Sequence, residues 1–409
     1  LMRSSAASDV YKRQRKEERR EIWNGTGGGW LESPHVYHIG DYYYILAAEG
    51  GTNYTHMETA ARSKNIYGPY ENCPYNPVLT NRNDTTKQIQ CAGHADLIDD
   101  ENGNWWMVHL GTRSVLKSKT PLGRETFLTP VEWKKGWPVA VNRRAKLENE
   151  LDRIVCRTKE ENAQNKNAYG QIETERNIHI GNSFNFKPNF SISSWEPQWL
   201  WLREPDITLY ERKSNALILH PSAFDFKAPA QPCFVGICQP DIDCHFQTTF
   251  TFEPKDGEEG GMLLYLSSNF YYRICKSKQK GKTQLAVIRK LDDVEVTDYV
   301  KELESTESPI TIYINASAAG YHITWKTEDE ALEDAGTYSL RFLCTEIENR
   351  CFTGTIIGIY AADHTIIQRK TSEQDKKQNL QYDIKKQETL KIQRSSSSMT
   401  ITNFEASVC

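Results

Sequence analysis

Between residues 23 and 142, apolar and polar positions alternate in short runs, and these runs form two similar segments. In the first, residues 34–37 lead through a Gly-Asp turn into the aromatic-led run 42–47. In the second, residues 93–98 lead through an Asn-Gly turn into residues 104–110. Alternation with a period of two, rich in aromatic and β-branched residues and broken by a Gly-containing turn, predicts a β-hairpin in each segment.

Each hairpin is followed by two further strand-like pieces, so each segment predicts four short antiparallel strands. These pieces are residues 59–63 and 78–79 after the first hairpin, and residues 127–133 and 137–141 after the second. Four short strands that recur after about sixty residues are typical of the blades of a β-propeller. Because closed propellers have about four to eight blades, residues 21–142 are expected to be the last blades of a larger propeller.

The rest of the chain divides into segments of different character. Residues 1–20 lack an apolar period and are expected to be an adapter-like or disordered start, and the charged, Asn-rich residues 143–178 are expected to be a linker. From residue 179 to 409, short alternating runs separated by polar turns predict a lectin-like β-sandwich. The Lys-, Gln- and Ser-rich residues 366–398 predict a disordered insertion before a closing strand at 399–404.

Composition and charge narrow the classes of partner and compartment. The net charge of -4 argues against nucleic acid as the main partner, and no apolar run approaches the roughly eighteen residues of a membrane span. Five Asn-x-Ser/Thr sequons agree with a secreted glycoprotein. In that compartment short disulfide loops are expected from cysteines that lie close in sequence, namely Cys233, Cys238 and Cys244, or Cys344 and Cys351. The oligomeric state stays open.

One acidic residue stands at the entrance of the first hairpin. Glu32 follows a Gly-rich stretch and has Trp30, Leu31 and Pro34 as neighbours in sequence. Apolar surroundings disfavour the charged form of a carboxyl group and raise its pKa, which suits a general acid that works near neutral pH. The alternative is a solvated Glu at a strand edge, which is the commoner situation for this residue type.

Seven motifs stand in a fixed order between residues 23 and 141. They are Glu32-Ser33-Pro34-His35-Val36-Tyr37, Ala48-Glu49-Gly50-Gly51-Thr52, His56 with Ala61-Arg62-Ser63, Gly68-Pro69-Tyr70-Glu71, Gly93-His94-Ala95-Asp96, Leu122-Gly123-Arg124-Glu125-Thr126 and Gly136-Trp137-Pro138-Val139. In this order they resemble glycoside hydrolase family 43, five-bladed propeller enzymes that trim arabinoxylan. More loosely, residues 195–360 resemble the concanavalin-like C-terminal sandwich of its β-xylosidase branch. The resemblance implies an all-β chain made of a partial five-bladed propeller followed by this sandwich.

The resemblance also assigns chemical roles. It implies an inverting mechanism, in which an Asp base activates water and a Glu acid protonates the leaving oxygen. Glu32 matches the acid, whereas the base and a further Asp that tunes the acid belong to earlier blades and are not in this sequence. Arg124 matches an Arg that reaches substrate hydroxyls, and the alternative for Arg124 is a salt bridge to Glu125 or Glu132. The chain alone is therefore expected to be inactive.

Three histidines are weaker candidates for substrate contact. His94 would line the central channel, where some family members hold a water or Ca²⁺, and otherwise it would be a satisfied core residue. His56 and His35 fall in matching motifs and are further candidates. No cofactor is expected to be required, and the resemblance allows a structural Ca²⁺ near His94. Four tryptophans are expected to pack in the blade core rather than bind sugar, namely Trp105, Trp106, Trp133 and Trp137.

One loop departs from the family pattern. In the family, a loop of the sandwich with the form Phe-Val-Gly/Ala-Arg-Arg-Gln forms one edge of the pocket. This chain has Phe234-Val235-Gly236-Ile237-Cys238-Gln239, so that both Arg positions are replaced. The departure puts in doubt whether this domain closes the site. A disulfide at Cys238 is an alternative way of holding the domain.

The function expected from the resemblance is that of a secreted exo-glycosidase that removes xylose or arabinofuranose from xylan or arabinoxylan. Its partner would be a xylan-type polysaccharide or oligosaccharide, with no nucleic acid and no membrane. The sequence leaves the choice between the two pentoses open. The alternative class is a non-catalytic, lectin-like glycan-binding protein, which fits the ten Trp, the sandwich and the missing base.

Overall fold

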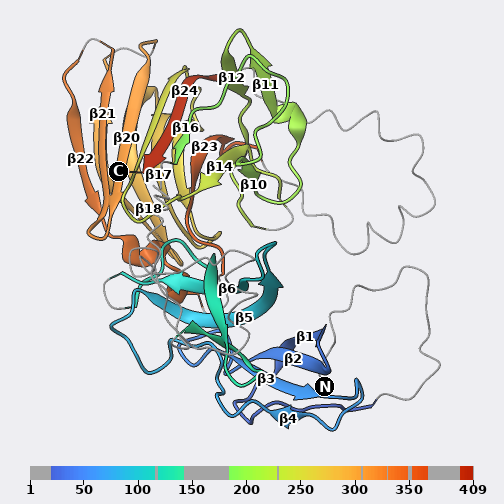
Figure 1. Cartoon of the computed structure of the whole chain (residues 1–409). Helices are drawn as coiled ribbons and strands as arrows, with labels where there is room; N and C mark the ends of the chain where they lie inside the picture. The colour runs from blue at the N-terminus through green and yellow to red at the C-terminus, as the bar shows by residue number, and fades with distance from the viewer. Residues whose placement is uncertain are drawn as a thin grey trace, which may run out of the picture. The chain divides into compact units, whose positions relative to one another are not determined.

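The computed structural model describes residues 20–115, 118–141, 184–227, 230–304, 307–328, 330–348, 352–366 and 397–408. The chain divides into two compact units (Figure 1), each of which is considered by itself below. The first lies within Leu1–Ser118 and Arg124–Ile180, and the second comprises Lys119–Gly123 with Gly181–Cys409. The start predicted at residues 1–20, apart from Arg20, and the linker predicted at 143–178 lie outside the described residues. The same holds for nearly all of the insertion predicted at 366–398.

The first sheet of the first unit is a four-stranded antiparallel meander. It contains β1 (Glu32–Ile39), β2 (Tyr42–Glu49), β3 (Met57–Ser63) and β4 (Glu71–Asn72), in that order. Gly40 adopts a φ of 59° in the turn between β1 and β2, a conformation that Gly enters at little cost. The predicted hairpin is confirmed, but the strand predicted at 78–79 is wrong. Leu79 forms only an isolated bridge to Glu58, and the fourth strand is β4.

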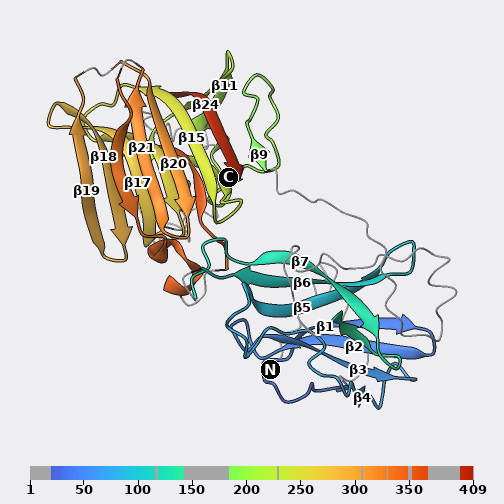
Figure 2. The same ribbon diagram turned by 60° about the vertical axis from the view of Figure 1, so that its left-hand side comes forward.

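The second sheet repeats this order with β5 (Ile89–Asp99), β6 (Trp105–Arg113), β7 (Glu125–Trp133) and β8 (Pro138–Ala140). The two sheets lie one above the other in Figure 2 and share one hydrophobic cluster, which includes Leu46, Leu97 and Val139. The inward faces of both sheets are apolar because every second residue of each strand points to the same side. Trp137 is buried in this cluster, and Trp105 and Trp133 pack against it, as core roles require.

The second unit is a sandwich of two eight-stranded sheets. One sheet has the order β10 (Leu200–Trp201), β14 (Phe234–Cys238), β23 (Ile356–Asp363), β16 (Glu258–Tyr265), β17 (Phe270–Gln279), β18 (Lys282–Leu291) and β19 (Val294–Glu302), with β13 (Ser222–Ala223) on β23. The other has the order β11 (Tyr210–Lys213), β12 (Ala216–Leu219), β24 (Met399–Val408), β15 (Cys244–Phe252), β20 (Ile310–Ser317), β21 (Gly320–Thr327) and β22 (Glu333–Tyr338), with β9 (Asn185–Phe186) on β24. The short 3-10 helices are η3 (Ile207–Leu209), η4 (Leu340–Leu343) and η5 (Thr345–Ile347).

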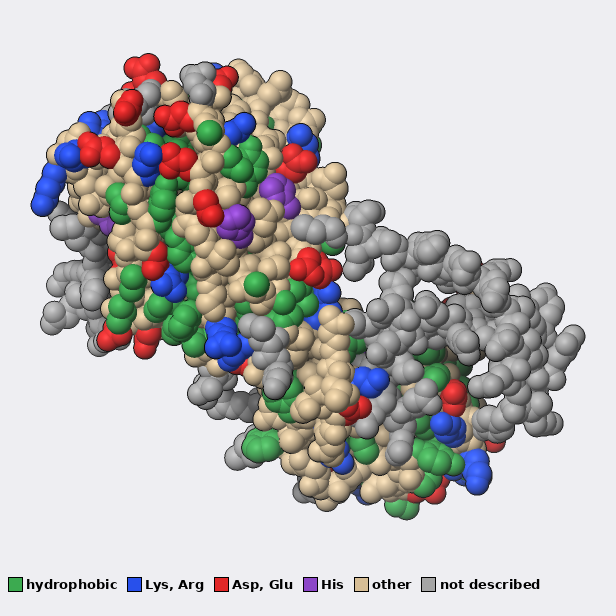
Figure 3. Space-filling view, turned by 90° about the vertical axis from the view of Figure 1, so that its left-hand side faces the viewer, with side chains coloured by type: hydrophobic (Ala, Val, Ile, Leu, Met, Phe, Trp, Pro, Cys, Tyr) green, Lys and Arg blue, Asp and Glu red, His purple; other side chains and the backbone are tan. Residues whose placement is uncertain are grey.

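Strict alternation along the strands builds the sandwich core. In β15, every second residue is buried, namely Cys244, Phe246, Thr248, Phe250 and Phe252, and the residues at the alternate positions are partly exposed. Outward positions carry charged and polar side chains, and acidic, basic and histidine side chains are spread over the visible face of the sandwich in Figure 3. The predicted sandwich is therefore confirmed. No helix among the described residues is long and apolar enough to cross a membrane.

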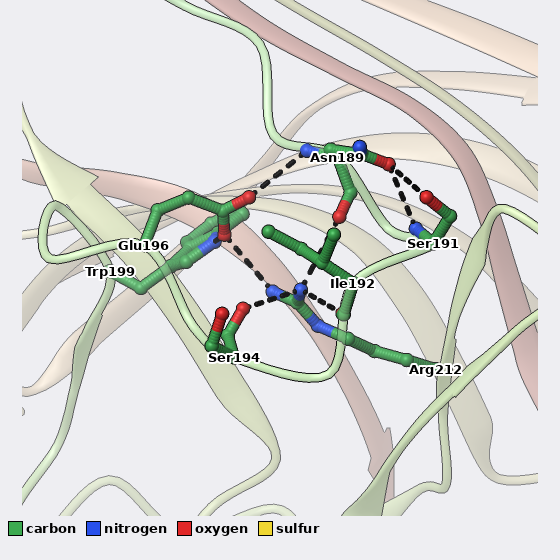
Figure 4. Close-up of polar contacts among 7 residues, drawn as sticks. All are labelled: Asn189, Ser191, Ile192, Ser194, Glu196, Trp199 and Arg212. Carbon is green, nitrogen blue, oxygen red and sulfur yellow. Dashed lines mark hydrogen bonds and ion pairs between the residues drawn. The ribbon is translucent and has the colours of Figure 1, made fainter.

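A polar cluster joins the segment before β10 to the edge strand β11 (Figure 4). The Arg212 guanidinium donates to the carbonyl oxygens of Ile192 (2.8 Å) and Ser194 (2.9 Å). It also pairs with the Glu196 carboxylate at 3.1 Å and lies 4.3 Å from the centre of the Trp195 ring. Because these donors and acceptors satisfy each other, the irregular segment packs without secondary structure of its own. The cluster has a structural role at the sandwich edge.

A buried ion pair lies within the sheet that contains β16 and β17. The Arg273 guanidinium donates to the Glu259 carboxylate at 2.7 Å, and both side chains are 3% exposed. Burial alone would raise the pKa of Glu259, but the adjacent charges of Arg273 and His364 lower it to about 2. A folded-state pKa below the unfolded value means that the ionised carboxylate stabilises the fold above about pH 4. This contribution is lost as the pH falls toward 2.

We expect Glu259→Gln to lower the free energy of unfolding by about 3 kcal/mol at pH 7, because it removes the buried carboxylate partner of Arg273 and leaves only the pair with the half-exposed Glu295 carboxylate at 2.7 Å. The loss relative to the wild type should shrink as the pH approaches 2, and denaturant unfolding at pH 7 and at low pH measures it. Glu302→Gln, which removes the exposed pair with Lys282 (2.9 Å), is the matched control and should cost about 1 kcal/mol or less. Equal losses in both variants would contradict the prediction.

The disulfides expected around Cys238 are wrong. Cys233 and Cys238 are free thiols, and neither pairs with the buried Cys244. The reason lies in the topology, because Cys238 ends β14 in one sheet whereas Cys244 begins β15 in the other. The Cys233 thiol is buried and its Sγ lies 3.8 Å from the Leu209 carbonyl oxygen, and this burial raises its pKa. Cys344 is also a free buried thiol, and its expected partner Cys351 lies outside the described residues.

Candidate active site

Glu32 is the first residue of β1 and pairs with Ala48 of β2. The register shifts between Glu32 and His35, so a bulge separates Glu32 from the regular part of the hairpin. Its carboxylate is 44% exposed and its Oε1 lies 3.7 Å from Nδ1 of His94. The apolar enclosure expected from the sequence does not form within the described residues, because Trp30 is 78% exposed and Pro34 is also exposed. Histidine, rather than apolar side chains, is the neighbour of this carboxylate.

The Gly-rich loop before Glu32 is held by a second acid that the sequence reasoning did not single out. The Glu49 side chain is 1% exposed. Its two carboxylate oxygens accept hydrogen bonds from the backbone N–H groups of Thr26 (2.7 Å) and Gly28 (2.6 Å). A further bond comes from the Thr59 hydroxyl at 2.7 Å. The sequence held one signal for this role, namely an acidic residue at the end of the apolar run 44–49. A buried carboxylate requires hydrogen-bond donors, which the neighbouring loop could supply.

His56 and His94 complete a compact group with Glu32. One ligand atom of each of the three side chains lies within 4.8 Å of the others. His56 is 1% exposed, and its Nδ1 lies 2.8 Å from the Cys91 carbonyl oxygen. Burial lowers the pKa of His56, so this imidazole is neutral at physiological pH. Gly93 lies directly against the ring, since an added Cβ would be 3.0 Å from three of its atoms.

His94 is presented to Glu32 by a distorted part of β5. The register of β5 shifts on both sides of Gly93, and His94 has a φ of 58°, a conformation that is unfavourable for a residue with a Cβ. Glu58, which is 0% exposed, accepts a hydrogen bond from the backbone N–H of Ala95 at 2.9 Å. Burial raises the pKa of Glu58 well above its usual value, which favours the protonated, neutral form of this side chain. Glu58 therefore supports the strained backbone that presents His94.

We expect Glu58→Gln to leave the free energy of unfolding within about 1 kcal/mol of the wild type, because the side-chain carbonyl of Gln still accepts the Ala95 N–H bond and Gln is uncharged like the form of Glu58 that burial favours. Glu58→Leu should cost about 1–3 kcal/mol, since the Ala95 N–H is then buried without an acceptor. Thermal unfolding of the two variants measures the difference. A Gln variant that is as unstable as the Leu variant would show that the carboxyl group itself is required.

Arg124 immediately precedes β7 and lies close enough to Glu32 for the two charges to interact. Burial lowers the pKa of the Arg124 guanidinium, while the negative charge of Glu32 acts in the opposite direction. The two carboxylates considered as alternative partners have other ion pairs: Glu125 with Arg113 at 2.8 Å, and Glu132 with Lys134 at 3.1 Å. The structure thus brings Arg124, from the position just before β7 of the second sheet, toward the group of Glu32, His56 and His94.

This geometry can be compared with known proteins. The family model for glycosyl hydrolases family 43 matches residues 5–138, and the model for the beta xylosidase C-terminal concanavalin A-like domain matches residues 187–375. The chain belongs to glycosyl hydrolase family 43. A relative from Bacteroides ovatus, named non-reducing end alpha-L-arabinofuranosidase BoGH43B, is 33% identical over 85% of this chain and 62% of its own length. A xylosidase/arabinosidase from Butyrivibrio fibrisolvens is 31% identical over 84% of this chain and 63% of its own length.

The fold agrees with this family. A solved structure titled Bacteroides ovatus Xyloglucan PUL GH43B superposes with a TM-score of 0.76 at 28% identity, and the match covers 95% of this chain and 68% of that one. The blade-type sheets and the concanavalin-like sandwich expected from the resemblance are thereby confirmed. The chain spans less than two thirds of the length of the two curated relatives.

One predicted residue of this family 43 chain lies outside the group. His35 is on β1 beyond the bulge, and its Nδ1 pairs with the Asp96 carboxylate at 2.9 Å. The Tyr37 hydroxyl donates to the same carboxylate at 3.3 Å. The structure therefore joins His35 to β5 through Asp96 and does not bring it to Glu32. Asp96 therefore has structural partners on β1.

The three-residue group does not fit the Ca²⁺ that some family 43 members hold. Glu32, His56 and His94 offer one carboxylate oxygen and two imidazole nitrogens. Ca²⁺ takes six to eight oxygen ligands, whereas imidazole nitrogen suits transition metals. These three side chains thus provide too few oxygen donors for a dedicated calcium site.

The replaced loop of the sandwich is part of a regular strand. Phe234–Cys238 forms β14, in which Ile237 is 2% exposed and Cys238 is exposed. Ile237, at the first replaced Arg position, is therefore a core residue. Cys238 lacks the fork of hydrogen-bond donors that Arg supplies. Neither residue can reproduce the polar contacts expected of the two arginines.

Proposed function

We propose that the protein to which this chain belongs is an inverting exo-glycosidase that releases xylose or arabinofuranose from xylan or arabinoxylan, with Glu32 as general acid. The observation that supports this most directly is the convergence of the Glu32 carboxylate with His94, His56 and the Arg124 guanidinium. An acid that is open to solvent on one side and surrounded by hydrogen-bond donors can protonate a leaving oxygen while its neighbours bind sugar hydroxyls. His94 and Arg124 are the proposed substrate-binding groups, with His56 behind them.

The second half of the chemistry requires a base. Inverting glycosidases place two carboxyl groups about 6.5–9.5 Å apart, with a water molecule between the base and the sugar. Among the described residues, Glu49 and Glu58 are the buried acids nearest in sequence to the site, and both accept backbone hydrogen bonds that give them structural roles. We therefore propose that an Asp encoded outside this sequence is the base. Secretion and independence of any cofactor are part of the same proposal.

The experiment is hydrolysis of 4-nitrophenyl xyloside and 4-nitrophenyl arabinofuranoside by the chain extended with its upstream coding sequence. Turnover of either substrate supports the proposal, and inversion is checked by following the anomer of the released sugar by NMR. Unchanged rates in the presence of EDTA are expected. Turnover of neither substrate would reject the hydrolase.

A non-catalytic glycan-binding protein is the second candidate. Two observations favour it: the concanavalin A-like domain at residues 187–375 and the lack of an assigned base among the described residues. Binding of xylan without turnover by the extended protein, unaffected by Glu32→Gln, would support this candidate. Loss of turnover in the same variant would reject it.

A further inference from the structure

Trp30 combines two properties that are costly for a folded protein. Its side chain is 78% exposed, the highest value among the exposed large hydrophobic residues of the described chain. Its φ is 49°, in the left-handed region that bulky residues rarely adopt. An exposed indole gains little from burial, so packing does not offset this backbone strain. Strain that persists at an exposed aromatic residue indicates a functional constraint.

The loop that carries Trp30 is held firmly in this conformation. Glu49 accepts hydrogen bonds from the backbone N–H groups of Thr26 and Gly28. The N–H of Gly50 donates to the carbonyl oxygen of Gly29, the residue before Trp30, at 2.9 Å. The backbone is therefore fixed on the N-terminal side of the indole, and the strained conformation does not reflect a loose segment.

The surroundings of the indole leave room for a ligand. The ring lies beside Gly51, where an added Cβ would be 3.5 Å from Cε3 of Trp30. At Gly27 and Gly29 an added Cβ would meet no atom within 4 Å, so the loop surface next to the indole is open. A flat ring beside bare backbone gives an apolar platform with little steric obstruction.

We propose that Trp30 is a stacking platform for a sugar ring on the leaving-group side of the bond that Glu32 protonates. The inference rests on the proposed function, since it takes Glu32 as the acid. Only Leu31 separates the two residues, so their Cα atoms are no more than about 7 Å apart. The acid of a glycosidase faces the leaving oxygen, so a platform next to it meets the sugar that departs. Aromatic rings offer a large, rigid face to the apolar face of such a sugar.

The first test uses the chain as it is, with ¹⁵N-labelled tryptophan and xylohexaose as the probe. The indole N–H signal that disappears in Trp30→Phe identifies Trp30. This signal should shift on titration with xylohexaose and shift less with xylose, which has no leaving-group sugar. A Trp30 signal that does not move with xylohexaose would overturn the proposal.

The second test separates binding from folding. Trp30→Ala should weaken xylohexaose binding roughly fivefold, whereas Trp30→Phe should retain most of it. Tyr67→Ala removes another exposed aromatic side chain, at 61% exposure, and should leave the affinity unchanged. Trp30→Gly should raise Tm, because Gly tolerates the left-handed conformation, and yet weaken binding. A lower Tm in Trp30→Gly would show a structural role and overturn the proposal.

Failure of the proposed function gives a different result. If the extended wild-type protein hydrolyses neither nitrophenyl glycoside, the hydrolase is rejected whatever Trp30 does. If it hydrolyses them and Trp30→Ala binds xylohexaose as tightly as the wild type, only the platform is rejected. The two outcomes come from separate measurements and are not confused.

Discussion

Glu32→Gln in the extended protein is expected to lower kcat/KM for xylobiose by about 10²–10⁴-fold, the usual contribution of a general acid. Gln has nearly the same volume as Glu and can stay beside His94, which lies 3.7 Å from the carboxylate. It cannot deliver a proton to the leaving sugar. The loss with 4-nitrophenyl xyloside should be smaller, because nitrophenolate departs with little protonation. The ratio of the two losses identifies an acid rather than a binding residue.

Glu132→Gln is the matched control for this substitution. Glu132 lies on β7 and is 44% exposed, the same fraction as Glu32, and it pairs with Lys134 at 3.1 Å. It should leave kcat/KM for both substrates within about twofold of the wild type, since an exposed ion pair contributes little. If Glu32→Gln lowers kcat/KM equally for both substrates, or for neither of them, the assignment of Glu32 as the acid is wrong.

The fold was predictable because local patterns of alternating apolar residues and turn residues specify its strands. The first predicted hairpin, with residues 34–37 and 42–47 on either side of Gly40, and the second, at residues 93–110, each combine period-two alternation with a turn residue, and both hairpins form. The same is true of strands such as Cys244–Phe252, whose alternation is strict. The weak strand predicted at 78–79 failed because two apolar residues do not distinguish a strand from an isolated bridge.

The site was predictable only in its residue types. The motifs pointed to Glu32, His56 and His94, which the structure brings together, but their arrangement depends on features that alternation does not encode. Two register shifts turn β5 so that His94 faces Glu32 instead of following the regular strand. His35 could not be separated from this group in the sequence, since its pairing with Asp96 joins residues sixty-one positions apart.

The supporting acids show a further limit of sequence reasoning. Glu49 and Glu58 lie in strands whose other residues are largely buried, where a charged residue usually indicates an outward position. Both point inward because loop and bulge N–H groups that have no partner in a sheet ladder need acceptors. Those N–H groups become visible only when the loop at 25–29 and the bulge at 93–95 take their shape. The inward positions of Glu49 and Glu58 therefore result from the same loop and bulge that form the site.

Arg124→Lys in the extended protein is expected to lower kcat/KM by about 10²-fold, mainly through a higher KM. The planar guanidinium can bind two adjacent sugar hydroxyls at once, whereas the ammonium group of Lys is a point charge on a flexible stem. Lys keeps the positive charge, so the electrostatic interaction with Glu32 remains and only the fork of donors is lost. Initial rates over a range of xylobiose concentrations separate KM from kcat.

Arg113→Lys tests whether any Arg in this region would behave in the same way. Arg113 makes three hydrogen bonds of 2.8–3.0 Å to the Glu125 carboxylate, so its role lies in the sheet and not toward substrate. We expect Arg113→Lys to lower Tm while KM stays near the wild-type value, and Arg124→Lys to raise KM while Tm stays unchanged. A lower Tm with an unchanged KM in Arg124→Lys would instead place Arg124 among the structural residues. The acid would then work without the guanidinium that the geometry brings toward it.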